Sequence, residues 1–353
     1  MKGGPIYAIM DLDDSGEVTA HDEDTLFAAA KEEILRVVVD DLDDGMRSNL
    51  ALIAPPFYGL EAFLDRMAKA LYPRAQRLDG ADLYRDGGLP PESDKSIGIV
   101  SGMEGLYRRR IGGFEAMKRF IDHVASSPHL FIATCNVYSW EYLQEILPLG
   151  QVFPLQIRLP VLDAKDLMEI HLSLYGEAEL EFAIEKETPV RVGCPIRLGR
   201  RSVAIRGWKV EVPVPEVRIK DLKDLRPCLR HKTEPPPSKR VFFERLARIS
   251  GGNPGVAEIL WRRALEYPLV RSETLQEVPS IDLDFDHSFI LSIILSKGSL
   301  ELKEIAEVAG RSMEILYGLQ RRGMISFDGK TISMQPEALK GAADHLRRLK
   351  LVV

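Results

Sequence analysis

This 353-residue sequence has few of the residues that usually carry covalent or metal chemistry. It contains three cysteines and seven histidines. Cys135, Cys194 and Cys228 lie far apart, which excludes a disulfide framework or a zinc-type spacing and favours a reducing cytoplasm. His123 and His129 have no acid or cysteine at metal spacing, and no Gly-x-Ser-x-Gly sequence occurs. Nothing in this pattern indicates a thiol, serine or zinc enzyme.

Long apolar runs and an excess of positive charge are also absent. The most apolar stretch, VFPLQIRLPVL, is interrupted by prolines and an arginine, so no membrane insertion is expected. The first residues, MKGGPIYAIMDLDD, have too short an apolar run for a signal peptide. The net charge of −6 argues against a protein that mainly coats nucleic acid. With 45% hydrophobic residues, the chain can bury the cores of two or three domains.

The chemistry of a phosphate-binding loop is missing from a place that has the right scaffold. Residues 49–54 (NLALIA) predict a buried strand, and a helix is expected from about Leu60 after a turn. A GxxxxGK[ST] loop in this context binds phosphate through backbone N–H groups, a lysine and a metal-binding hydroxyl. Here Pro55 holds the first glycine place and has no N–H. Leu60, Glu61 and Ala62 hold the Gly-Lys-Thr places, so a carboxylate would face the triphosphate and repel it.

The chain divides into five regions by pattern. Short apolar strands at 50–54, 96–100 and 130–134 alternate with helical segments such as 114–125, which indicates a parallel α/β sheet in a domain spanning 46–176. An acidic loop and a helix precede it in 1–45. A β-rich insertion with a proline-rich linker fills 177–238, and a helical lid follows in 239–280. Residues 281–353 show three helices, a hairpin and a final helix, the layout of a winged helix.

Four of these segments together resemble a divergent P-loop ATPase of the AAA+/STAND type, near the origin-recognition-like archaeal and bacterial ATPases. The first is the degenerate loop. The second, SIGIVSGMEG, is similar to a Walker B strand, but Ser101 and Gly102 stand where acids are expected and Glu104 is the nearest acid. The third, LFIATCN, resembles a sensor-1 strand ending at Asn136. The fourth, SGGNPGVAEILWRRAL, is similar to the start of a lid helix, with Arg262 or Arg263 near the sensor-2 place. Its alternative interpretation is an ordinary helix start, with Asn253 as the cap ahead of Pro254 in the first turn.

The resemblance implies a P-loop NTPase-like parallel sheet with a helical lid and a C-terminal winged helix, and it locates a vestigial nucleotide site. That site comprises Pro55, Gly59, Leu60, Glu61, Ala62, Ser101, Gly102 and Asn136. Because the lysine, the hydroxyl and the acids are all replaced, we expect no catalytic residue, no cofactor and no hydrolysis, and ATP binding is doubtful. For Asn136 alone, a hydrogen-bonded strand-end residue is the favoured interpretation. For 108–110 (RRR), a solvated helix face is favoured over an arginine finger reaching a neighbour.

The N-terminal region has two interpretations. Residues 11–22 (DLDDSGEVTAHD) fit the spacing of an EF-hand-type loop, in which Ca²⁺ would be bound by Asp11, Asp13, Ser15, Glu17 and Asp22. The twelfth place holds Asp22 instead of glutamate, and the preceding GGPIYAIM is a poor incoming helix. The alternative is a β-hairpin whose turn accommodates Asp, Ser and Gly, and we favour it.

Two clusters of basic residues are candidates for partner or nucleic-acid contact. Arg321, Arg322 and Lys330 lie at the end of the third helix and in the wing of the winged helix, but Glu301, Glu304, Glu307 and Glu314 surround them in sequence. Since phosphate contacts dominate affinity for DNA, protein docking is preferred and DNA contact is the runner-up. Arg200 and Arg201 are expected at the tip of the β-rich hairpin. The closing helix (338–350) is expected to be part of the core.

Three functional hypotheses follow. The leading one is a catalytically silent AAA+/STAND-like pseudo-ATPase that acts as a structural or regulatory subunit through a protein partner, such as an active homologous ATPase. The second is a winged-helix DNA-binding protein of the origin-recognition type. The third is an ATPase with an unconventional site that uses residues such as Glu104 and Asn136.

Overall fold

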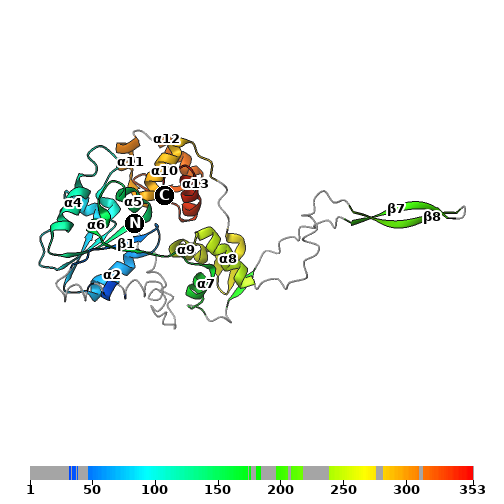
Figure 1. The fold of residues 1–353 in the computed structure, drawn as a ribbon, viewed down its shortest axis with the longest axis horizontal. Coiled ribbons are helices and arrows are strands. Elements are labelled where there is room, and N and C mark those ends of the chain that lie inside the picture. Colours follow the sequence, from blue (N-terminus) through cyan, green and yellow to red (C-terminus); the bar gives the residue numbers. More distant parts are fainter. Residues whose placement is uncertain are drawn as a thin grey trace.

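The computed structural model describes residues 32, 34–36, 38, 47–173, 175, 180–183, 196–205, 208–217, 238–275, 281–309 and 313–352. Three units recur below. The strand–helix unit covers 47–158, the helical unit covers 164–183 and 238–275, and the C-terminal unit covers 281–352. In Figure 1 the C-terminal unit lies above the sheet and the helical unit lies beside it.

A five-stranded parallel sheet forms the centre of the strand–helix unit, with strand order β2-β3-β4-β1-β5. Its three central strands are buried along their whole length, as expected for parallel strands covered on both faces. The predicted α/β class is confirmed. The two edge strands were not predicted, because they are partly exposed and carry polar residues. The strands are β1 Leu50–Ala54, β2 Ala75–Asp79, β3 Ile97–Ser101, β4 Leu130–Asn136 and β5 Leu155–Arg158.

Helices cover both faces of this sheet. On one face Phe63, Leu64 and Met67 of α2 pack against the central strands, and on the other face Met117 and Phe120 of α4 do so. Helix α2 begins at Leu60, as predicted. The helices of the unit are α2 Leu60–Ala70, α3 Gly80–Arg85, the 3-10 helix η1 Met103–Leu106, α4 Glu115–Ser126, α5 Val137–Gln144 and α6 Leu149–Val152.

The helical unit is built around an aromatic core. The rings of Phe243 and Trp261 stack with centroids 5.5 Å apart, and the buried His171 ring lies 5.2 Å from that of Trp261. Helix α7 packs against α8 and α9, although it precedes the boundary predicted at residue 176. The elements are α7 Ala164–Ser173, β6 Glu181–Ala183, α8 Ser238–Ser250, α9 Pro254–Ala264, β9 Leu265–Glu266, β10 Leu269–Arg271 and η4 Ser272–Thr274.

The β-rich insertion contains an antiparallel pair of strands, β7 Ile196–Ile205 and β8 Trp208–Val217. Arg200 is paired with Pro213 and Arg201 with Val212, in the middle of the strands. The expectation that these arginines lie at the hairpin tip is therefore wrong, because regular strand pairing continues to Ile205. The proposed calcium loop, with Asp11, Asp13, Ser15, Glu17 and Asp22, lies outside the described residues.

The C-terminal unit has its elements in the predicted order, and its small antiparallel sheet has strand order β11-β13-β12. The final helix buries Leu339, Ala342 and Leu346, so it belongs to the core as predicted. Among the helices of the ranges described above, none is long and apolar enough to cross a bilayer. The elements are α10 Phe285–Lys297, β11 Ser299–Glu301, α11 Leu302–Ala309, α12 Met313–Arg321, β12 Ile325–Phe327, β13 Thr331–Met334, η5 Pro336–Ala338 and α13 Leu339–Arg348.

The buried His171 makes the stability of the helical unit depend on pH. Burial lowers the pKa of His171, an effect that the carboxylate of Glu258 at 3.9 Å only partly offsets. The unfolded chain therefore binds a proton more readily than the folded one, and stability is lost as the pH falls below about 6.5. We expect the urea midpoint to fall less between pH 8 and pH 5 in His171→Phe and His171→Gln than in the unaltered protein. Equal falls in all three proteins would contradict this.

Candidate functional site

A cavity of about 430 Å³ lies at the carboxyl ends of β1, β3 and β4. This edge of a parallel sheet is where α/β proteins bind their ligands. Its wall is formed by residues 54–62, 102, 104 and 134–136 of the strand–helix unit, and by 297–299 and 333 of the C-terminal unit. All residues of the predicted vestigial site except Ser101 line this cavity. Lys297, Ser299 and Ser333 had no signal in the sequence, because they come from a different unit about 160 or more residues away from β4.

The turn after β1 makes its strongest contacts with protein atoms. The hydroxyl of Tyr58 donates to the carbonyl of Pro160 at 2.6 Å, and burial raises the Tyr58 pKa. Phe57 has a φ of 67°, an unusual value for a residue with a side chain. Pro55 and Pro56 offer no N–H to a phosphate. The turn therefore lacks, at these two positions, the backbone donors that a phosphate loop offers.

The first residues of α9 close one side of this turn. Asn253 caps the helix ahead of Pro254, as the sequence predicts, because its Oδ1 accepts from the N–H of Val256. Its Nδ2 donates to the carbonyl of Pro56 at 2.7 Å. A Cβ added to Gly255 would lie 1.7 Å from the carbonyl oxygen of Phe57, so only glycine fits at this approach. The helical unit is seated directly on the turn.

Glu61, in the place of the phosphate lysine, is paired within the strand–helix unit. Its carboxylate accepts from the guanidinium of Arg77 on β2, which also pairs with Asp65. These contacts hold the acid beside the edge strand. Arg66 and Lys69, the two basic residues of α2, are not among the residues that line the cavity.

Glu104 and Asn136 are hydrogen-bonded to the protein itself. Glu104 Oε2 accepts from the backbone N–H of Asn136 at 3.0 Å, and burial raises the pKa of Glu104. The Asn136 side chain accepts from the N–H of Tyr138 at 3.0 Å and donates to the carbonyl of Leu295 at 2.8 Å. Asn136 is therefore a hydrogen-bonded strand-end residue, the interpretation favoured from the sequence.

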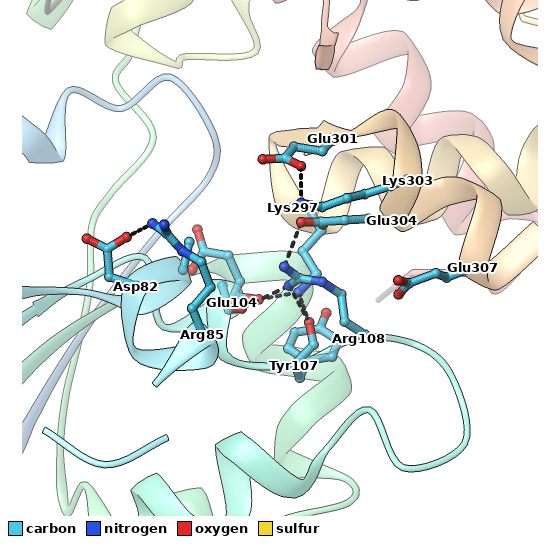
Figure 2. Close-up of polar contacts among 12 residues, drawn as sticks. Asp82, Arg85, Glu104, Tyr107, Arg108, Lys297, Glu301, Lys303, Glu304 and Glu307 are labelled. Carbon is cyan, nitrogen blue, oxygen red and sulfur yellow. Dashed lines mark hydrogen bonds and ion pairs between the residues drawn. The ribbon is translucent and has the colours of Figure 1, made fainter. Parts of the chain in front are cut away.

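Lys297 places an ammonium in the cavity wall from the C-terminal unit (Figure 2). Its Nζ donates to the carbonyl of Tyr107 at 2.6 Å and to that of Glu104, and it lies 3.5 Å from the centre of the Tyr107 ring. Burial, followed by the charge of Arg108, lowers the pKa of Lys297. The ammonium thus binds backbone oxygens of the strand–helix unit.

Arg108 and Arg109 join the two units, so the predicted solvated helix face is wrong for them, whereas Arg110 is exposed. These residues lie in the turn after η1, where they face α10 and α11. Arg108 pairs with Glu304 at 2.6 Å, and the two side chains are only 11% and 14% exposed. Arg109 donates to the hydroxyl of Ser296 at 2.9 Å. Glu304 and Glu307 of the acidic α11 thus serve as partners for this loop, and Figure 2 shows the pair of Glu304 with Arg108.

The remaining predicted basic residues lie away from the cavity. Arg262 pairs with Glu258, and Arg263 pairs with Glu337 of η5. Arg322 donates to the carbonyl of Asp282 at 2.6 Å. Arg321 and Lys330 are exposed at the end of α12 and in the turn between β12 and β13. They stay candidates for an external contact.

The residues at this site do not fit a magnesium-bound triphosphate. Such a ligand needs a lysine and free N–H groups on the turn, and oxygens that hold the metal. The turn has two prolines, Glu61 faces Arg77, and the half-buried Glu104 carboxylate accepts from the Asn136 N–H. Within the described part of the chain, no group of three or more His, Cys, Asp or Glu side chains is placed to hold a metal ion.

Comparisons with known proteins give likenesses of structure alone. No family model matches the sequence, and no curated protein matches it. Solved structures with a similar chain course include the ORC2 protein of Aeropyrum pernix in ADPNP–ADP complexes, with a TM-score of 0.39, 12% identity and coverage of 92% of this chain and 94% of that one. A RuvB mutant of Thermotoga maritima gives 0.39, 15%, 91% and 94%. The ORC1 protein of Aeropyrum pernix in complex with DNA gives 0.36, 14%, 92% and 93%.

With TM-scores of 0.36 to 0.39, these likenesses carry neither the fold class nor the function. The fold class rests on the strand order and burial described above.

The two ion pairs of the arginine loop allow a matched test. Arg108→Ala leaves the buried carboxylate of Glu304 without its partner, so the free energy of unfolding should fall by about 3 kcal/mol. Arg110→Ala removes a pair whose side chains are 44% and 40% exposed, and its effect should lie within experimental error. Chemical denaturation of both variants measures the difference. Equal effects of the two substitutions would contradict the assigned burial.

Proposed function

We propose that this chain is a catalytically silent AAA+/STAND-like pseudo-ATPase that acts as a structural or regulatory subunit through protein–protein contacts. The observation that supports it most is the set of partners at the strand ends. The Glu104 carboxylate accepts from the Asn136 N–H, the Asn136 amide donates to the Leu295 carbonyl, and the Lys297 ammonium donates to the Glu104 carbonyl. The polar groups that would meet a nucleotide are therefore already hydrogen-bonded within the protein. A scaffold that keeps its architecture without the chemistry suits binding to another protein.

The C-terminal unit is the proposed contact module. Its order of three helices and a β12–β13 hairpin is that of a winged helix, and we take it as one. The α11 acids Glu304 and Glu307 are used within the chain, which leaves α12 and the hairpin for an outside partner. An active homologous ATPase is the partner that we propose, with the cytoplasm as the location.

The proposal is tested first against its enzymatic alternative. Calorimetric titration with Mg-ATP should show no binding in the micromolar range, and a phosphate-release assay should show no turnover above a protein-free blank. The reason is the absence of a lysine on α2 near the turn and the lack of N–H groups at Pro55 and Pro56. Micromolar binding together with phosphate release would establish the third hypothesis, an ATPase with an unconventional site.

The partner is the second arm of the same test. Affinity purification of the intact chain from its native source should recover a protein whose own sequence contains an intact GxxxxGK[ST] loop. The recovered protein should then bind the purified chain directly and hydrolyse ATP, which the chain alone does not. A chain that remains solitary under native conditions would count against the role of subunit.

Contact with DNA is the second candidate function, and one observation favours it. The α11 acids that argued against DNA from the sequence are paired with Arg108 and Arg110, whereas Arg321 and Lys330 are exposed. If this function holds, duplex binding should weaken steeply with salt, and Arg321→Ala and Lys330→Ala should each weaken it. Lys69→Ala, on the exposed surface of α2, is the control. If none of the three substitutions changes duplex binding, the surface formed by Arg321 and Lys330 is excluded as the DNA-binding site.

A further inference from the structure

We propose that the carboxyl end of α10 (residues 295–297) is a built-in ligand of the strand-end site, by which we mean Glu104, Asn136 and Ser139 at the ends of β3 and β4 and the start of α5. This contact holds the C-terminal unit against the strand–helix unit without nucleotide. The inference rests on the proposed function in that it takes the site as free of nucleotide. Three kinds of contact support it: hydrogen bonds to the last carbonyls of α10, cations beside them, and the return contact of Lys297.

The end of a helix leaves its last carbonyls without helical partners and carries a partial negative charge. In α10 the carbonyl of Leu295 accepts from Asn136 Nδ2 at 2.8 Å, and the carbonyl of Ser296 accepts from the hydroxyl of Ser139 at 2.6 Å. Both donors belong to the strand–helix unit, at the end of β4 and the start of α5. The strand-end site thus supplies the cap that this helix end lacks.

Positive charge complements the helix end. The guanidinium of Arg109 donates to the Ser296 hydroxyl at 2.9 Å, and it also lies 4.2 Å from the centre of the Tyr142 ring. Lys297, in the last turn of α10, makes the return contact through the carbonyls of Glu104 and Tyr107. Hydrogen-bond donors therefore cross the boundary between the strand–helix unit and the C-terminal unit in both directions. We call this boundary the seam. A phosphate group placed here would compete with the helix end for the same donors.

The burial of these groups makes the contact cooperative. Ser139 and Ser296 are fully buried, and Asn136 is 6% exposed. A partial slip of α10 would leave buried polar groups without partners, which is unfavourable. Full release would instead return them to water. The C-terminal unit should therefore be either seated or fully released, and the seated arrangement should not respond to nucleotide.

Hydrogen–deuterium exchange of the full chain tests this inference. Asn136→Ala and Ser139→Ala should each raise exchange about tenfold at residues 103–110 and 294–299 together, because release exposes both faces of the seam. The interiors of both units should keep their protection. Matched controls are Asn49→Ala and Ser288→Ala, which remove buried hydrogen bonds that stay within one unit. In these controls, hydrogen exchange at residues 103–110 and at residues 294–299 should not rise together.

Two other outcomes overturn the inference. Exchange that rises only beside the altered residue indicates local structural damage, and Mg-ATP that raises exchange at both faces of the unaltered protein indicates a nucleotide-controlled contact. If calorimetry detects Mg-ATP binding while residues 103–110 and 294–299 stay protected from exchange, the proposed function fails and this inference stands. If a variant fails to fold by circular dichroism, Lys297→Met replaces it, because it keeps the side-chain volume and removes only the ammonium.

Discussion

The seating of the α10 carboxyl end on the ends of β3 and β4 is the contact on which the arrangement of this protein depends. Asn136 and Ser139 donate to its last carbonyls, and Lys297 returns the contact from the helix to the strand–helix unit. The outer pair of Arg108 and Glu304 closes the same seam. One polar seam thus defines the cavity wall and positions the C-terminal unit.

Electrostatics explains why this edge of the sheet suits a protein contact better than a triphosphate. A nucleotide site concentrates unpaired donors and a cation where the ligand will sit. Here the donors are used by a helix end, Glu61 pairs with Arg77, and the turn gives a carbonyl to Asn253. The helical unit and the C-terminal unit therefore pack against this edge of the sheet from two sides.

Sequence reasoning succeeded where a signal is local and failed where a partner is distant. The buried central strands, the start of α2 and the Asn253 cap follow from apolar runs and capping chemistry within a few residues. The edge strands β2 and β5 were missed because half-exposed strands lack such a run. Arg108 and Arg109 were wrongly predicted to be solvated because a run of three arginines usually is, and their partners Glu304 and Ser296 are nearly 200 residues away.

The order of apolar strands and helices along the chain was enough to predict a parallel α/β sheet. The residue types at 55–62 were enough to show that the lysine and the Ser/Thr hydroxyl of a phosphate loop are not there. Both conclusions depend only on residues that are close in sequence. Which groups meet at the strand ends could be known only from the folded molecule. Lys297, Asn136 and Glu104 come together because the C-terminal unit packs on the sheet edge. The effect of their charges and hydrogen bonds depends on burial and distance, and neither can be predicted from the local sequence.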